Sequence, residues 1–166
     1  VPELLPGTGT AWQRDALVVA GAIPVDLAYI DSPYNQHKYL GNYHIWESLV
    51  LWDKPEVYGV ACKRIDCKTR GSPFNSKSMA RAAMRVVVEQ IQARYILVSF
   101  NDEGFIPRAD MEAILRTRGT VQTFAVDSKR YVGAQIGIHN PQGEKVGTVG
   151  ALRNTEYLFL VTVTTP

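Results

Sequence analysis

The stretch Val25-Asp26-Leu27-Ala28-Tyr29-Ile30-Asp31-Ser32-Pro33-Tyr34 decides how the chain folds in our interpretation. A run of strand-forming residues stops there at a carboxylate, a turn and an aromatic ring. Its apolarity is nearly continuous rather than alternating, which predicts a strand over 25–30 that is buried on both faces, as in a parallel sheet. Because ligands of open α/β sheets bind at the carboxyl ends of strands, we expect a crevice at residues 31–34.

Helical and strand patterns alternate on both sides of this stretch. The predicted helices cover 16–20 (capped by Asp15), 42–53 (with Asn42 as N-cap and Tyr43, Trp46, Leu49 and Val50 on one face), 78–93 and 107–119, and the further strands cover 95–100, 121–126, 131–138 and 157–163. This order predicts an α/β fold whose sheet is mostly parallel and finishes in a C-terminal antiparallel hairpin.

The composition is that of a globular protein without a membrane span. A chain of 166 residues, 46% hydrophobic and 20% charged, suits one domain that buries roughly two thirds of its unfolded surface. No apolar run approaches the roughly 20 residues that cross a bilayer, and no secretory signal is present, so we expect a cytoplasmic protein. Cys62 and Cys67 lack the partners of a tetrahedral metal site, so we expect two reduced thiols and no metal.

Two segments have no clear periodicity. Residues 1–14 are rich in Pro and Gly and are interpreted as a loop or linker remnant, because no strand precedes their Gly-x-Gly. Residues 15–166 then form the domain, with a long basic loop at about 54–77. Six basic residues and one acidic residue lie between Lys63 and Arg81, which is typical of a phosphate-binding loop but also of an ordinary solvated surface.

Four blocks of the chain resemble, in order, the Dam-like class of adenine-specific DNA methyltransferases. The Asp-Ser-Pro-Tyr motif at 31–34 is similar to the Asp-Pro-Pro-Tyr motif of that family, and the family's following segment matches 35–47. Residues 98–104 and 129–133 are similar to two later blocks. The resemblance covers roughly 12–163 and implies a Rossmann-like methyltransferase sheet, S-adenosylmethionine as cofactor and DNA as substrate.

The resemblance implies a catalytic role for Asp31, Ser32, Pro33 and Tyr34. The adenine amino group is a poor nucleophile, and two acceptors aimed at its hydrogens favour the geometry that attacks a methyl group. The Asp31 carboxylate and the Ser32 carbonyl can supply them, while Pro33 orients that carbonyl. Tyr34 can stack on a base that has been extruded from the duplex.

Further roles are implied at single positions. Asp15 matches an acidic position near the cofactor's adenine moiety, although a helix cap explains it equally well. Together with Asp31 it would bind the cofactor. For the substrate, we expect contacts from Asn35 and Tyr39 in the loop after the motif and phosphate contacts from basic residues, namely Lys63, Arg64, Lys129 and Arg130. We expect structural rather than acid–base roles for His37 and His44.

The chain departs from the family pattern in two ways. Ser32 stands where the pattern has proline, so backbone rigidity is lost but the carbonyl remains. The family's cofactor-binding Phe-x-Gly-x-Gly block has no match, so we expect the N-terminal half of the sheet to be missing and another segment or chain to supply it.

The leading functional hypothesis is therefore S-adenosylmethionine-dependent methylation of the exocyclic amino group of adenine in DNA, within a restriction-modification setting. One alternative is an amino methyltransferase that acts on RNA, cytosine or glutamine. Another is a non-catalytic nucleic-acid-binding relic of such an enzyme, which Ser32 and the absent Gly block favour.

Overall fold

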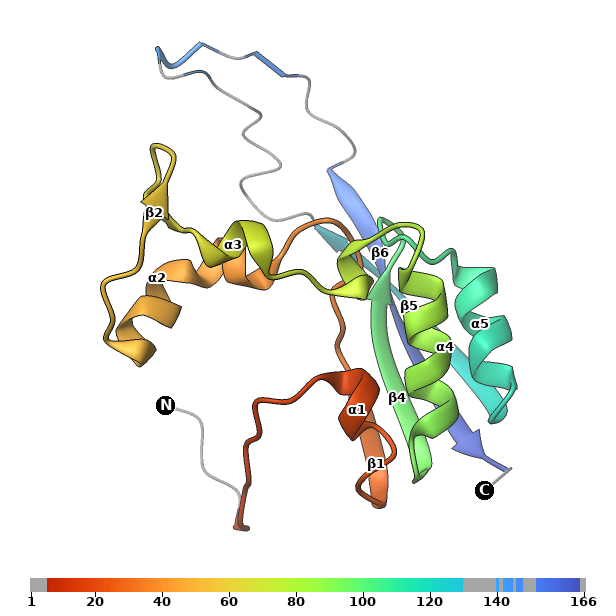
Figure 1. Ribbon diagram of the computed structural model, residues 1–166. Coiled ribbons are helices and arrows are strands. Elements are labelled where there is room, and N and C mark those ends of the chain that lie inside the picture. Colours follow the sequence, from red (N-terminus) through yellow and green to blue (C-terminus); the bar gives the residue numbers. More distant parts are fainter. Residues whose placement is uncertain (1–5, 130–139, 141, 145, 148–151, 165–166) are drawn as a thin grey trace.

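The computed structural model describes residues 6–129, 140, 142–144, 146–147 and 152–164, and Figure 1 shows their arrangement. The elements follow in the order α1 (Ala16–Val19), β1 (Val25–Ile30), α2 (Tyr39–Leu51), β2 (Val57–Tyr58), β3 (Lys63–Arg64), α3 (Asp66–Thr69), η1 (Pro73–Asn75, a 3₁₀ turn), α4 (Ala80–Gln90), β4 (Ala93–Asn101), α5 (Arg108–Arg116), β5 (Gly119–Lys129) and β6 (Arg153–Val163). The predicted strand over 131–138 lies outside the described residues. No helix in the described part of the chain is long and apolar enough to cross a membrane.

The main sheet has four strands in the order β1-β4-β6-β5. β1 is parallel to β4, whereas β6 is antiparallel to both β4 and β5. The predicted α/β class is confirmed, but the expectation of a mostly parallel sheet is wrong for the described strands. The reason is β6, which inserts between β4 and β5 instead of adding at the edge, and a strand pattern alone does not reveal the pairing order.

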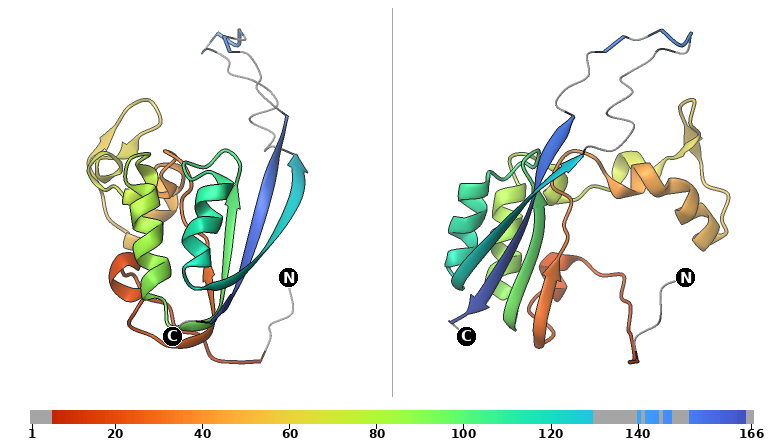
Figure 2. Two further views of the ribbon diagram at one scale, coloured as in Figure 1. Left: turned by 90° about the vertical axis from the view of Figure 1, so that its right-hand side faces the viewer. Right: turned by 180° about the vertical axis from the view of Figure 1, so that it is seen from behind.

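Three helices cover one face of the sheet. Figure 2 shows α1, α4 and α5 on the same side of the sheet, and among the described residues no helix covers the other side. Alternate residues of β4, Ile96, Val98 and Phe100, face the helices and are buried. Met111, Ile114 and Leu115 of α5 are buried, and with residues of α4 they complete the core.

One face of strand β1 is exposed in the described structure, which corrects the prediction that both of its faces are buried. Ala28 and Ile30 face the helices. On the other face Leu27 is 52% exposed and Tyr29 is 57% exposed. The continuous apolar pattern therefore describes a strand with one covered and one open face among the described residues.

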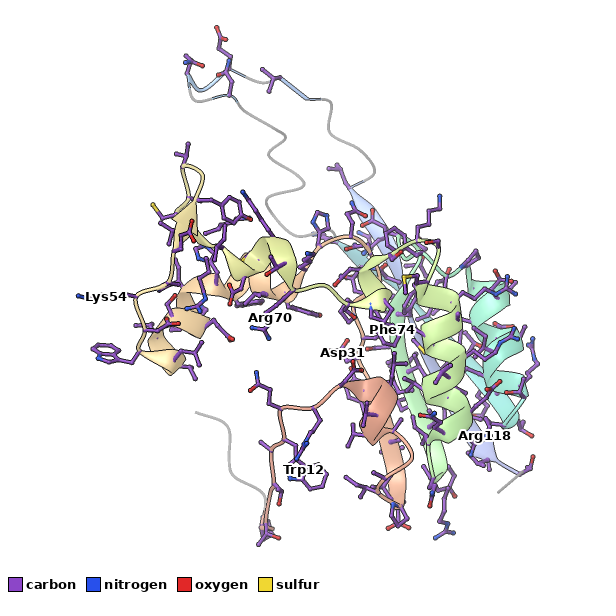
Figure 3. All side chains as sticks on the ribbon, viewed as in Figure 1. Trp12, Asp31, Lys54, Arg70, Phe74 and Arg118 are labelled. Carbon is purple, nitrogen blue, oxygen red and sulfur yellow. The ribbon has the colours of Figure 1, made fainter. Side chains whose placement is uncertain are left out.

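A buried arginine caps the C-terminal end of helix α4. Arg118, which lies near the lower end of α4 in Figure 3, donates hydrogen bonds to the carbonyls of Val88, Glu89 and Ile91. These carbonyls belong to the last turn, where the helix itself offers no donors. One side chain thus satisfies three carbonyls and fastens α5 and β5 to α4.

Residues 39–70 form a small unit that projects from the sheet (Figure 1), and most of it was expected to be an irregular loop. Arg64 organises it: its guanidinium donates to Asp53 at 2.6 and 2.9 Å and to Asp66 at 3.3 Å, and its side chain is only 6% exposed. The segment predicted as a loop at about 54–77 contains the short elements β2, β3, α3 and η1, which the sequence did not predict because ion pairs leave no periodic pattern.

Helix α2 begins earlier than predicted. It starts at Tyr39, after Lys38, and has non-helical backbone angles at Tyr43, so Asn42 lies before a kink rather than at an N-cap. It ends at Leu51, where Trp52 adopts a left-handed conformation with φ of 51°. The predicted apolar face, Tyr43, Trp46, Leu49 and Val50, is exposed.

Candidate active site

The 31–34 motif lies at the carboxyl end of β1, next to the end of its parallel neighbour β4. Figure 3 shows Asp31 at this point, between the sheet and the projecting unit. The Asp31 side chain is exposed rather than turned into the core. A carboxylate is therefore available to a ligand at the edge where α/β sheets bind ligands.

The Asp31 carboxylate is held by a neighbouring strand. The Ser99 hydroxyl of β4 donates to Asp31 Oδ1 at 3.0 Å, and the Tyr29 hydroxyl donates to Ser99 Oγ at 2.9 Å. Ser99 and Tyr29 were not among the residues predicted for the site. Ser99 could have been noticed, because it lies in the 98–104 block that resembles the family.

Two of the cavities that the described residues form at the motif differ in character. The larger, of about 630 Å³, is lined by Asp31 and Ser32, by Asp15, and by apolar residues of α1, β1 and α4. The smaller, of about 390 Å³, is lined mainly by polar and aromatic residues: Pro33, Tyr34, Asn35, His37, Tyr39 and Asn42. Pro33 borders both, so the motif stands between an apolar chamber with carboxylates and a chamber with aromatic rings.

Tyr34 is fixed from two sides. Its ring packs edge-on against Phe100, with centroids 5.8 Å apart, and its carbonyl accepts a hydrogen bond from the Phe105 amide at 2.7 Å. Burial, with the nearby charge of Glu156, raises the pKa of the Tyr34 hydroxyl. Gly104 leaves the room that the Phe100 ring occupies, since a Cβ there would overlap it.

Ser32 carries a polar atom without a partner. Its Oγ is buried and makes no hydrogen bond among the described residues. A buried hydroxyl without a partner costs about 1–3 kcal/mol. The serine that replaces the family's proline is therefore a local source of instability.

The loop after the motif is clamped from residues that the sequence did not single out. Asn75 of η1 donates to the carbonyls of Asn35, at 2.8 Å, and His37, at 3.1 Å. Lys38 donates to the carbonyls of Arg70, at 2.8 Å, and Cys67, at 3.2 Å. The Asn75 bonds tie the loop to η1 and the Lys38 bonds tie it to the projecting unit, and no sequence pattern marks them because they join side chains to distant backbone.

Two further residues predicted to contact a ligand, Asp15 and Tyr39, lie at the two cavities. Asp15 caps α1 by accepting from the Leu17 amide at 2.9 Å, and it also lines the larger cavity with Asp31, so the cap and the ligand role can coexist. Tyr39 stacks on Tyr43 with centroids 6.2 Å apart and lines the smaller cavity. His37 lies at the same cavity, whereas His44 is buried in α2.

The basic cluster is less available than its sequence indicates. Arg64 is buried between Asp53 and Asp66, so we correct its assignment as a phosphate contact. Arg70 pairs with Glu47, Arg81 pairs with Asp110, and the Lys68 ammonium lies 4.2 Å from the centre of the Tyr58 ring. Lys63 is partly exposed and Lys129 is exposed at the end of β5, while Arg130 lies outside the described residues.

The described part of the chain holds no group of side chains that could bind a metal ion, and Cys62 and Cys67 are free thiols. Cys67 is buried, and its thiol lies 3.7 Å from the Leu40 carbonyl.

Comparisons with known proteins show which family the sequence of this chain matches. Residues 7–114 match the sequence profile of the D12 class N6 adenine-specific DNA methyltransferases. The chain is 32% identical to the type II methyltransferase M.FokI of Planomicrobium okeanokoites over 120 residues, which are 72% of this chain and 18% of that protein. It is 35% identical to the modification methylase StsI of Streptococcus sanguinis over 106 residues, 64% of this chain and 16% of that protein.

A shorter relative gives the same result. The type II methyltransferase M.NlaIII of Neisseria lactamica is 27% identical over 120 residues, which are 72% of this chain and 35% of that protein. The chain thus spans less than two fifths of the length of each of these relatives. No solved structure matches the chain.

Proposed function

Because the chain belongs to the D12 class N6 adenine-specific DNA methyltransferase family, we propose that its 31–34 motif methylates the exocyclic amino group of adenine in DNA. The observation that carries the proposal is the exposed Asp31 carboxylate, which stands at the carboxyl end of β1 between two cavities. The names of the relatives, type II methyltransferase and modification methylase, support DNA methylation in a restriction-modification setting.

The two cavities support separate binding sites for the target base and the cofactor, on either side of the motif. The smaller cavity holds the target base, with Tyr34 and Tyr39 as stacking partners and Asn35 on its wall. At the border of the two cavities, the Asp31 carboxylate and the Ser32 carbonyl accept hydrogen bonds from the amino group of the base. Stacking offsets part of the few kcal/mol that extrusion of a base from the duplex costs.

The larger cavity suits S-adenosylmethionine, which supplies a sulfonium methyl group when bound. Its walls are apolar, and Asp15 and Asp31 place carboxylates on them, a combination that fits a nucleoside with a cationic sulfur nearby. Asp15 would accept hydrogen bonds from the nucleoside, and Asp31 would lie at the end where base and cofactor meet. Lys63 and Lys129 would contact DNA phosphates.

We propose that a further segment or chain covers the helix-free face of the sheet and completes the cofactor site. The support is the open face of β1, where Leu27 and Tyr29 are exposed although the sequence pattern is that of a strand covered on both sides. Among the described strands, β1 also has an unpaired edge, since β4 is its one neighbour.

The proposed activity is tested with the chain purified together with the segment or chain that completes its cofactor site, with tritiated S-adenosylmethionine and unmethylated duplex DNA, and with Asp31→Ala as the matched variant. We expect transfer to adenine by the wild type and a loss of at least about 100-fold in Asp31→Ala. Structured RNA serves as the competing substrate. Equal counts for the wild type and Asp31→Ala would contradict catalysis and support the non-catalytic DNA-binding alternative, which a DNA-binding assay on the same samples detects.

A further inference from the structure

Asp31 and Ser99 are brought together by the register of two parallel strands. Tyr29 of β1 pairs with Leu97 of β4, and side chains two residues further along point to the same face. Asp31 and Ser99 are therefore neighbours on the helix-free face, although they are 68 positions apart in the sequence.

The chemistry of the three groups sets the direction of their hydrogen bonds. A carboxylate only accepts, so the Ser99 hydroxyl gives its one proton to Asp31 Oδ1, at 3.0 Å. The Ser99 oxygen is then left as an acceptor, and the Tyr29 hydroxyl donates to it at 2.9 Å. Hydrogen bonds in such a chain polarise and strengthen one another.

We infer that Ser99 is a positioning residue that holds Asp31 in one orientation, and that Tyr29 acts through Ser99. With Oδ1 tied to β4, Oδ2 is the carboxylate oxygen left to accept from a substrate amine, because no other described side chain donates a hydrogen bond to the Asp31 carboxylate. The orientation of the carboxylate depends on the structure alone, whereas its effect on methyl transfer rests on the function proposed above.

The orientation is measured without cofactor or DNA. Three-bond couplings to Asp31 Cγ report its χ1 rotamers by NMR, and we expect a single rotamer in the wild type and rotamer averaging in Ser99→Ala. Ser99→Thr, which keeps the hydroxyl, restores the single rotamer. Thr162→Ala, which removes a hydroxyl from the same sheet face without touching Asp31, leaves it unchanged. An averaged wild type, or an unchanged Ser99→Ala, would overturn the inference.

The catalytic consequence is measured in the methyl-transfer assay. We expect kcat to fall about 10-fold in Ser99→Ala, with KM for DNA within about twofold of the wild type, because the lost bond orients a group that acts in the transition state. Tyr29→Phe should lose about threefold, and the double variant should be no slower than Ser99→Ala, since Tyr29 has no other route to Asp31. Tyr95→Phe, on the same face, is the control for a lost tyrosine hydroxyl.

The outcomes of the two experiments are distinguishable. A wild type that transfers no methyl group, combined with rotamer averaging in Ser99→Ala, rejects the proposed function and upholds the positioning of Asp31. An active wild type whose kcat is unaffected by Ser99→Ala rejects the role of Ser99 in positioning Asp31 for catalysis. Additive losses in the double variant reject the inference that Tyr29 acts through Ser99.

Discussion

At the residue scale, the motif combines a well-placed carboxylate with a poorly satisfied neighbour. Asp31 is oriented by Ser99, and Tyr34 is fixed by Phe100 and Phe105, so two of the four motif residues are preorganised. Ser32 differs, since its buried Oγ has no partner among the described residues. The position where the chain departs from the family pattern is thus also a point of local instability.

Replacing Ser32 tests this directly. Ser32→Ala removes the unpaired hydroxyl, and we expect it to be more stable than the wild type by up to about 1 kcal/mol. Ser32→Pro should gain about 0.5–1 kcal/mol more, because proline also restricts the unfolded chain. Urea unfolding at neutral pH measures both. A Ser32→Pro protein less stable than Ser32→Ala would mean that the backbone at this position does not accept proline.

At the element scale, Glu112 combines two ion pairs within α5 with a hydrogen bond to the neighbouring strand β5. Glu112 of α5 accepts from Arg108 at 2.8 Å, from Arg116 at 2.6 Å and from Thr123 of β5 at 3.1 Å. The hydrogen bond from Arg108, followed by that from Arg116, lowers the pKa of Glu112 to about 2, from an ordinary value of 4.5. Its side chain is 13% exposed, so solvent still screens part of this effect.

The lowered pKa predicts a pH dependence of stability. A carboxyl group whose pKa falls on folding stabilises the protein above its unfolded pKa and loses that contribution as the pH falls through its folded pKa. We therefore expect the wild type to be more stable than Glu112→Gln above about pH 4.5, with the difference disappearing as the pH approaches about 2. Thermal unfolding across this range measures it, with Glu89→Gln as the control. A constant difference across the range would exclude the ionic contribution.

At the scale of the whole molecule, the sheet is covered by helices on one face only among the described residues (Figure 2). The other face carries exposed apolar side chains on β1, β5 and β6, including Leu27, Phe124, Val126 and Leu158. Phe124 and Leu158 are direct cross-strand neighbours, so they form part of a continuous apolar surface. This surface is where we propose that a further segment or chain packs.

Substitutions on the two faces should change the free energy of unfolding by different amounts. Phe124→Thr combined with Val126→Thr should change the free energy of unfolding by less than about 1 kcal/mol, because both side chains are about half exposed, and should reduce binding of a hydrophobic dye. Val161→Thr, on the covered face and fully buried, should cost about 1–3 kcal/mol by burying a hydroxyl. Comparable losses of stability in the double variant and in Val161→Thr would show that the helix-free face is already covered.

Local sequence patterns predicted most of the elements correctly. The strand at 25–30, the helix capped by Asp15 and the buried face of α5 follow from apolar periodicity and capping residues, which act over a few residues. The position of the motif after a strand follows in the same way. Patterns of this kind do not reveal which residues far apart in the sequence contact one another.

The sequence by itself determined the local elements, the 31–34 motif and the family resemblance, because each is written in neighbouring residues. Only the tertiary structure decided that β6 lies between β4 and β5, that Arg64 is a buried ion-pair centre rather than a phosphate contact, and that Ser99 holds Asp31. The physical reason is that strand order, ion pairs and side-chain hydrogen bonds depend on which segments meet in space, and those contacts join residues that no short pattern connects.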